Sequence, residues 1–334
     1  MCRAGGRSMI NQSASRAAGA FVHPALFYQG DVEYLEGVGG FVRAALTADE
    51  PVLVAVPGPR LEALRESLGL GSAEVTWTDM TLLGRNPGRI LAALQDFADR
   101  YADRPARIVG EPIWPGRSQA EVLEATRHEA LINTAFAGRQ ATVLCPYDVL
   151  GLSAAVVSDA RRTHPTVLAQ GKALLSPDYA DAASVCADCD RPLPEPAPGS
   201  DGGASWLAYT RGGLGEVRAY ADDWARGTAL SAARRGDLVL AVSEAAANSL
   251  AHGGGRGSLR LWSTDGAEVG AGSGIVAEIR DDGRLADPLS GRRRPTLTSA
   301  NGGRGLWMIH QLCDLVEIRA SDSGLTLRLH MATS

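Results

Sequence analysis

Four prolines alternate with other residues along "DRPLPEPAPGSDGG", from Pro192 to Pro198, and the pattern of the chain differs on the two sides of them. Alternating prolines favour an extended, semi-rigid backbone. Hydrophobic periodicity also lapses around them, so we predict a Pro-rich linker over residues 169–203. At 334 residues the chain has room for about two domains, one on each side of this linker.

Before the linker, short apolar runs alternate with amphipathic segments of helical length. The expected strands are 51–58, 74–80, 106–114 and 141–148, and the expected helices are 60–69, 86–104 and 118–138. Asn86 is the expected N-cap of the second helix, with Pro87 in its first turn. This alternation predicts an α/β domain over residues 21–168, with a mostly parallel sheet covered by helices.

After the linker the order of elements changes. The expected helices are 212–230, 237–253 and 305–314, and the expected strands are 257–264, 274–283 and a hairpin over 315–331. Helices segregated from a largely antiparallel sheet predict an α+β two-layer sandwich over residues 204–334. Residues 1–20 are small and polar without periodicity, and we expect a disordered leader there.

Charge and composition exclude several classes of function. The net charge of −5 gives no bulk attraction to nucleic acid or to an anionic membrane surface. No apolar run reaches the ~18 residues that span a bilayer, and no signal peptide is recognisable. Five scattered cysteines argue against a disulfide scaffold. We therefore expect a cytoplasmic protein that binds neither nucleic acid nor membrane.

Two polar residues stand out in the apolar segment "DLVLAVSEAAANSLAHG". Glu244 and Asn248 are four residues apart, so their side chains lie on the same side of a helix, and His252 continues that line by one turn. Burying a carboxylate and an amide is unfavourable unless both find partners. They are either core polar groups that satisfy each other or parts of a binding site.

Two glycine-containing loops follow. Asp281 lies at a strand end two residues before Gly283, a pattern that suits recognition of an exocyclic amine but also an ordinary turn. In "NGGRGLWMIH", Gly303 and Gly305 precede a helix whose N-terminus favours anions. Met308 stands where the dinucleotide fingerprint G-x-G-x-x-G has its last glycine, and the chain contains no G-x-x-x-x-G-K-[ST] phosphate loop.

Taken in this order, Glu244 with Asn248, Asp281 with Gly283, and Gly303 with Gly305 resemble the histidine-kinase-like (GHKL) ATPase family over residues 204–334. The resemblance implies an α/β sandwich that binds ATP and Mg²⁺. Leu285 replaces the second glycine of the family's D-x-G-x-G pattern.

The resemblance also implies a role for each matching residue. Asn248 would supply an oxygen ligand to Mg²⁺, Asp281 would accept the adenine amino proton, and Glu244 would be the general base. The remaining cofactor-binding residues would be Gly283, Gly303, Arg304 and Gly305.

The stretch "DPLSGRRRP…NGGRGLWMIHQLCDLVEIR" is similar to the anti-sigma-factor branch of that family, whose members bind a sigma factor and phosphorylate a serine or threonine of an antagonist protein. In the first half, "GEPIWPGR", "RHEALINTAF", "LCPYD" and "ARRTHP" resemble the MEDS sensory domain, itself similar to RecA-like folds. Its "PGPR" loop lacks the lysine and the hydroxyl residue of a phosphate loop, which leaves sensing of a small-molecule signal or partner contact.

The whole sequence therefore predicts an anti-sigma regulator and ATP-dependent protein serine/threonine kinase under sensory control. Two alternatives stay open: a non-catalytic module that captures its partner with structural nucleotide or none, and an orphan sensor histidine kinase. No histidine lies in the linker, and His128 is expected to be structural, which disfavours the second. The resemblance leaves a homodimer open.

Three further features suggest weaker hypotheses. Cys186 and Cys189 form a lone C-x-x-C, expected to be exposed, for which solvated thiols, a reversible disulfide and a zinc site all stay open. The segment "GRRRP" over 291–295 is expected to be a solvated loop, with contact to phosphate or an acidic face as the alternative. His23, His128 and His164 are too far apart in sequence to propose as ligands.

Overall fold

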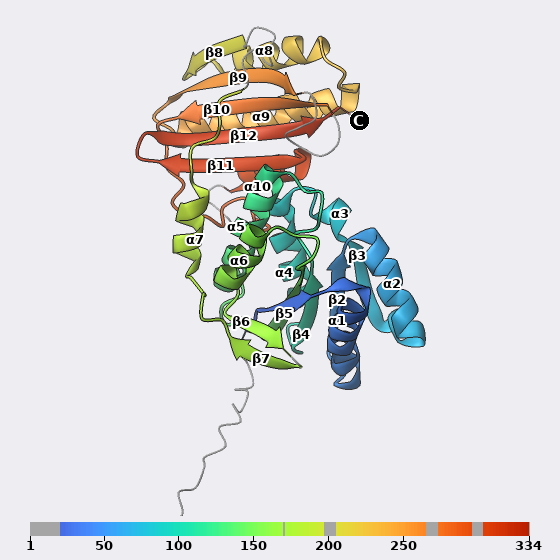
Figure 1. Cartoon of the computed structure of the whole chain (residues 1–334). Helices are drawn as coiled ribbons and strands as arrows, with labels where there is room; N and C mark the ends of the chain where they lie inside the picture. The colour runs from blue at the N-terminus through green and yellow to red at the C-terminus, as the bar shows by residue number, and fades with distance from the viewer. Residues whose placement is uncertain (1–20, 170, 197–204, 265–272, 296–302, 334) are drawn as a thin grey trace, which may run out of the picture.

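A computed structural model describes residues 21–169, 171–196, 205–264, 273–295 and 303–333. The expected leader, part of the expected linker, and Asn301 and Gly302 of the glycine loop lie outside the described residues. Two domains follow one another along the chain, each built around its own sheet (Figure 1). Within the described residues, no helix is long and apolar enough to cross a bilayer.

The N-terminal domain is an α/β domain with a seven-stranded sheet in the order β3-β2-β4-β5-β1-β6-β7. All neighbouring strands are parallel except β6 and β7. Its strands are β1 (Pro24–Tyr28), β2 (Val52–Val56), β3 (Val75–Asp79), β4 (Ala106–Gly110), β5 (Ala141–Asp148), β6 (Thr166–Ala169) and β7 (Lys172–Leu175). Its helices are α1 (Gly30–Thr47), α2 (Gly58–Leu68), η1 (Gly69–Glu74), α3 (Met80–Leu83), η2 (Pro87–Arg89), α4 (Ile90–Arg100), α5 (Gln119–Ala135), α6 (Ala154–Thr163) and α7 (Ala182–Cys189).

Both faces of this sheet are buried, as the continuous apolar strands predict. Along β2, Leu53 and Ala55 pack into one hydrophobic cluster, whereas Val52, Val54 and Val56 pack into another. Successive side chains of a strand point to opposite faces, so the two clusters lie on opposite sides of the sheet. The predicted mostly parallel sheet is confirmed.

The C-terminal domain is an antiparallel five-stranded sheet in the order β11-β12-β10-β9-β8, with helices against it. Its elements are β8 (Ser205–Thr210), α8 (Leu214–Arg226), α9 (Ala232–His252), β9 (Arg256–Thr264), β10 (Gly274–Asp281), α10 (Arg304–Leu312), β11 (Leu315–Ser321) and β12 (Gly324–Ala332). The predicted α+β sandwich is confirmed. Helix α9 begins five residues earlier than expected, because the Ser231 hydroxyl accepts a hydrogen bond from the Arg234 amide (3.2 Å) and caps it.

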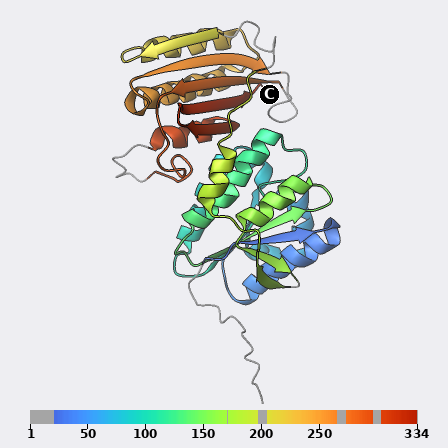
Figure 2. The ribbon, with the colours of Figure 1, turned by 60° about the vertical axis from the view of Figure 1, so that its left-hand side comes forward.

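Helix α10 faces the N-terminal domain (Figures 1 and 2), and two residues of that domain hold its C-terminal end. The Arg89 guanidinium donates to the carbonyls of His310 (2.8 Å), Gln311 (2.7 Å) and Cys313 (2.9 Å). The Asn86 amide donates to the carbonyls of His310 (3.1 Å) and Cys313 (3.3 Å). Carbonyls at a helix C-terminus lack partners within the helix, so these side chains cap α10 from another domain.

Asn86 also confirms its predicted role as an N-cap. Its side-chain oxygen accepts from the Gly88 amide (3.0 Å) at the start of η2, which leads directly into α4. Gly88 in turn packs so closely against the His310 ring that a Cβ there would overlap it. The short segment around Asn86 therefore starts one helix and ends another.

A buried cluster of charges crosses the same interface. The Glu124 carboxylate on α5 pairs with Arg292 (2.7 Å) and with Arg319 on β11 (2.6 Å), and Arg127 lies 3.6 Å away. Arg292 belongs to "GRRRP", so the expectation of a solvated loop is wrong for this residue, which is only 2% exposed. The alternative expectation was contact with an acidic face, and Arg292 makes such a contact with Glu124 of its own chain.

Part of the expected linker is folded onto the N-terminal domain. Strand β7 and helix α7 both lie within residues 169–203, and α7 packs against α5. Cys186 and Cys189 are both buried in α7 and carry no disulfide, so the expectation that they are exposed is wrong.

The proline segment crosses the sheet of the C-terminal domain. Glu195 pairs with Arg260 on β9 (2.9 Å) and with Arg280 on β10 (3.0 Å), and Arg328 on β12 donates to the Pro194 carbonyl (2.9 Å). Residues 194 and 195 are thus fastened to three neighbouring strands.

Candidate functional site

The polar residues of α9 meet the start of α10. A Cβ placed on Gly305 would lie 3.0 Å from Glu244 Oε2, 3.3 Å from Asn248 Nδ2 and 3.4 Å from Asn248 Oδ1. The first turn of α10 therefore packs against Glu244 and Asn248. These are the two side chains that their four-residue spacing predicts on one side of α9. Both side chains are half-buried rather than enclosed in the core.

Gly303 sets the direction of the chain at this point. Its φ of 84° is in the left-handed region that glycine adopts without strain, and no atom lies within 4 Å of the place where a Cβ would be. Among the described residues, no side chain caps the N-terminus of α10. Amide groups at a helix N-terminus lack partners within the helix, so this end of α10, which lies beside Glu244 and Asn248, is suited to anions.

Asp281 is held at the end of β10 by two donors. The Ser249 hydroxyl donates to its Oδ2 (2.6 Å), and the Gly283 amide donates to its Oδ1 (2.7 Å). Gly253, after the end of α9, packs directly against the carboxylate. The aspartate therefore makes the predicted turn and is also fixed as an acceptor beside α9. Asp282 instead pairs with Arg256 at the surface.

Ser249 is the residue that sequence analysis missed. It follows Asn248 directly and is fully buried, and it connects the α9 side of the site to Asp281. The sequence did hold a signal for Ser249, because it is a polar residue in an otherwise apolar helix and directly follows Asn248. His252, by contrast, is exposed at the last position of α9. Leu285 packs against the hydrophobic core of this domain, which explains an apolar side chain there.

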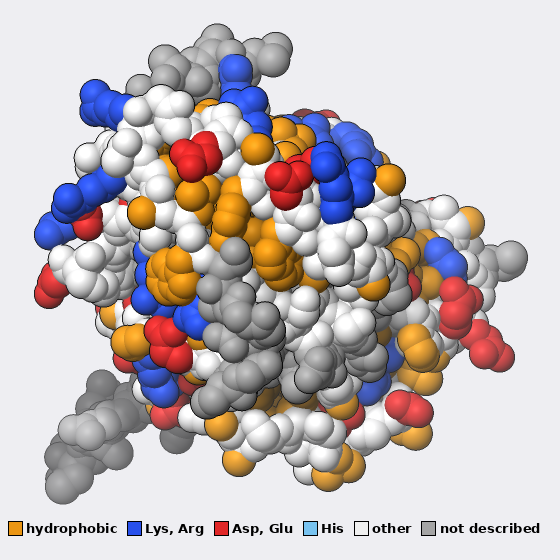
Figure 3. All heavy atoms as spheres, turned by 90° about the horizontal axis from the view of Figure 1, so that it is seen from above, with side chains coloured by type: hydrophobic (Ala, Val, Ile, Leu, Met, Phe, Trp, Pro, Cys, Tyr) orange, Lys and Arg blue, Asp and Glu red, His pale blue; other side chains and the backbone are white. Residues whose placement is uncertain are grey.

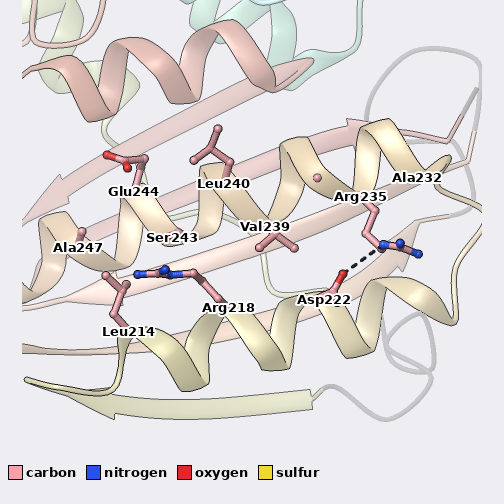
Figure 4. Close-up of a pocket in the computed structure, with 11 residues that line it drawn as sticks. Leu214, Arg218, Asp222, Ala232, Arg235, Val239, Leu240, Ser243, Glu244 and Ala247 are labelled. Carbon is pink, nitrogen blue, oxygen red and sulfur yellow. Dashed lines mark ion pairs between the residues drawn. The ribbon is translucent and has the colours of Figure 1, made fainter.

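A groove of about 520 Å³ runs between α8 and α9 (Figure 4). Leu214, Val239 and Leu240 supply apolar lining. Glu244 and Arg218 lie toward one end, and an ion pair between Arg235 and Asp222 (3.2 Å) lies toward the other. Glu244 thus belongs both to this groove and to the contact with Gly305.

The surface seen from above is of mixed character. Hydrophobic side chains gather there between basic and acidic ones (Figure 3). Trp206 on β8 is 53% exposed and Leu240 on α9 is 41% exposed. The C-terminal domain therefore exposes large apolar side chains beside charged ones.

Two distant histidines come together in the other domain. The ring centroids of His23 and His164 are 4.0 Å apart. We did not propose these histidines as ligands from the sequence alone because they are far apart in the chain. They are nevertheless close in space, because His23 precedes β1, His164 precedes β6, and these two strands are neighbours in the sheet. His128 is buried on α5.

Two family models match the chain, one for each domain. The model described as MEDS, "MEthanogen/methylotroph, DcmR Sensory domain", matches residues 22–165. The model described as "Histidine kinase-like ATPase domain" matches residues 208–331, which include every candidate residue of the site. A comparison with curated proteins gives no match.

Proposed function

Because the chain carries a MEDS domain followed by a histidine-kinase-like ATPase domain, we propose that it is an anti-sigma regulator whose N-terminal domain controls an ATP-dependent protein serine/threonine kinase. It would bind a sigma factor and phosphorylate an antagonist of that binding. The observation that carries this proposal is the convergence of Glu244, Asn248 and the first turn of α10 on one place.

The residues present fit ATP with Mg²⁺. The open space at Gly303 and the uncapped amides of α10 suit phosphate oxygens. The Asn248 side-chain oxygen is a hard ligand, suited to a Mg²⁺ ion that phosphates already hold. Asp281, fixed by Ser249 and Gly283, keeps lone pairs free to accept from the adenine amino group. Bound in this way, ATP would supply the γ-phosphoryl group.

In this proposal Glu244 acts as the general base. A hydroxyl entering from the groove between α8 and α9 would reach its carboxylate on the side that faces Gly305. Glu244 would take the hydroxyl proton as the new phosphorus–oxygen bond forms and the bond to the ADP oxygen breaks. The apolar lining by Leu214, Val239 and Leu240 suits a segment of polypeptide as the acceptor.

Control by the sensory domain has a physical route through α10. Its first turn carries Gly305, and Asn86 and Arg89 of the sensory domain hold its last carbonyls. A nine-residue helix moves as a rigid element, so a shift of the segment around Asn86 would displace Gly305 relative to Glu244. We propose that a small-molecule signal acts in this way.

The test is incubation of the full chain with γ-labelled ATP, Mg²⁺ and a candidate antagonist protein. We expect phosphoserine or phosphothreonine on the antagonist. Glu244→Gln should lower the transfer rate by roughly 10²–10⁴-fold with little change in ATP affinity, and Asp281→Asn should weaken ATP binding. Glu62→Gln, which alters a surface pair on α2, is the matched control.

Each other outcome overturns a stated part of the proposal. Transfer that Glu244→Gln leaves unchanged removes the role of that residue. Sigma-factor capture without any transfer supports the non-catalytic module instead. Acid-labile, alkali-stable phosphate on the chain itself supports a histidine kinase.

A further inference from the structure

Four side chains with metal-ligating atoms meet inside the sensory domain, far from the nucleotide site. His23 Nε2, Glu129 Oε2, Cys145 Sγ and His164 Nε2 all lie within 4.8 Å of one another. All four residues are at most 1% exposed. The sheet order brings them together, because β1, which follows His23, lies between β5, which carries Cys145, and β6, which follows His164. Helix α5 supplies Glu129.

The hydrogen bonds of the two imidazoles fix which nitrogen faces the centre. His164 Nδ1 lies 2.8 Å from the Ala160 carbonyl, which only accepts, so Nδ1 carries the proton. His23 Nδ1 lies 3.1 Å from Asn133 Oδ1. The Asn133 amide nitrogen donates to the Thr163 carbonyl (2.8 Å), so its oxygen is the acceptor and His23 Nδ1 is also the donor.

Both Nε2 atoms therefore present lone pairs to the centre. His23 Nε2 lies 3.1 Å from Glu129 Oε2, and His164 Nε2 lies 3.5 Å from the same oxygen. Lone pairs that face one another in a dry interior repel unless a proton or a cation lies between them. The Cys145 thiol, 3.4 Å from both His23 Nε2 and Glu129 Oε2, is the one donor among the four. Outer-shell partners that orient imidazoles in this way are typical of metal ligands.

We propose that His23, Glu129, Cys145 and His164 bind a structural Zn²⁺ ion. Two neutral imidazoles, a thiolate and a carboxylate carry two negative charges, so the complete site is neutral, which burial requires. The Cys145 proton is released to solvent on binding. Nitrogen, sulfur and oxygen ligands in this mixture favour zinc over magnesium or calcium.

The geometry needs little rearrangement. Zinc bonds of about 2.0–2.3 Å in a tetrahedron place neighbouring ligand atoms roughly 3.3–3.8 Å apart. Four of the six pairs of ligand atoms are separated by 3.1–3.5 Å, and the other two pairs lie within 4.8 Å. With four protein ligands and no exposed face, the site is closed, which is the form of structural rather than catalytic zinc. The ion would join β1, β5, α5 and the junction of α6 with β6.

The test measures metal in the full chain, purified without a histidine tag from zinc-supplemented cells. We expect about one zinc ion per chain by mass spectrometry of the metal. After exchange with Co²⁺, the protein should show the near-ultraviolet charge-transfer band of one cobalt–thiolate bond. Chelation should lower Tm, and added Zn²⁺ should restore it.

Variants locate the site. Cys145→Ser and His164→Gln should lose the bound metal and the charge-transfer band. The Cys186→Ser/Cys189→Ser variant is the matched control, because those thiols are also buried in the same domain but lie outside the cluster. If this control alone loses zinc, the metal lies at the C-x-x-C and our assignment is wrong.

The wild-type chain decides the question even where a variant fails to fold. A folded wild-type chain that contains no zinc and takes up neither Zn²⁺ nor Co²⁺ overturns the proposal. In that case a proton shared between an imidazole and Glu129 resolves the facing lone pairs. Activity of the nucleotide site is not part of the measurement, so failure here is distinct from failure of the proposed kinase.

Discussion

At the scale of residues, the absence of a side chain at Gly305 allows α10 to approach α9. Gly305→Ala would place a methyl group 3.0 Å from the Glu244 carboxylate and 3.3 Å from the Asn248 amide. Helix α10 or these two side chains must then shift by a few tenths of an ångström, and overpacking costs about 1–3 kcal/mol where they are held in place. We expect ATP affinity to fall by roughly 5- to 150-fold in isothermal titration calorimetry.

The matched control is Gly40→Ala, within α1, where no atom lies within 4 Å of the added Cβ. We expect this variant to bind ATP normally and to gain about 0.5–1 kcal/mol in unfolding free energy from helix propensity. Equal ATP affinity of Gly305→Ala and the wild type would contradict the close contact.

Sequence predicted one residue cluster and missed another for a physical reason. Glu244 and Asn248 are neighbours through the helical repeat, which is local and visible in sequence. His23, Cys145 and His164 become neighbours through the order of strands in a sheet, which no spacing along the chain reveals. The burial of Arg292 was not predicted for the same reason, because its partner Glu124 lies 168 residues earlier in the sequence.

At the scale of elements, α10 depends on another domain for the hydrogen bonds at its C-terminal end. Arg89→Ala removes three hydrogen bonds to its last carbonyls. Bonds from charged donors contribute about 1.5–3 kcal/mol each, and the Asn86 amide and water would replace part of that loss. We expect a loss of about 2–4 kcal/mol in urea denaturation and altered ATP affinity.

The control for this prediction is Arg65→Ala, which removes a surface pair with Glu62 (3.1 Å) and a cation–π contact with the Trp77 ring (5.2 Å). Exposed interactions of these two kinds contribute about 0.2–1 kcal/mol each. If Arg89→Ala destabilised the protein without changing ATP affinity, the sensory domain would support α10 but not control the site through it.

Strand β7 and helix α7, near the linker, were not predicted because neither has a clear hydrophobic periodicity in the sequence. All four residues of β7 are exposed, so the strand lacks the apolar alternation that identifies a half-buried strand. Helix α7 buries Val185, Cys186 and Cys189 against α5, and it is only eight residues long. By contrast, β5 and the strands of the final hairpin have long apolar patterns and were predicted closely.

At the scale of the whole molecule, the cluster around Glu124 stabilises the union of the two domains. Glu124→Gln would leave Arg292 buried without a carboxylate partner, and Arg319 would keep only its pair with Glu317 (2.9 Å). Removing one partner of a buried ion pair costs about 3–5 kcal/mol. We expect this loss in urea denaturation followed by tryptophan fluorescence, whereas Glu62→Gln should change stability by less than about 1 kcal/mol.

The same cluster predicts a dependence on pH. Burial alone would raise the pKa of Glu124, but Arg127, Arg292 and Arg319 lower it overall. The unfolded state therefore binds the proton first as pH falls, so the stabilisation is present above about pH 4.3 and is lost as pH falls through the folded-state pKa. The difference in unfolding free energy between wild type and Glu124→Gln should shrink below about pH 4. A difference that stays constant from neutral pH to pH 3 would contradict this.

The attachment of Pro194 and Glu195 to β9, β10 and β12 has a consequence for protein engineering. A chimaera that joins residues 21–196 to another output domain would carry Pro194 and Glu195 but not the arginines that hold them. Residues 194 and 195 would then lose their attachment to a sheet, and they would no longer fix the new output domain against the sensory domain. A graft that preserves signalling would have to carry Arg260, Arg280 and Arg328 with it, so the boundary between the two modules runs through the sheet.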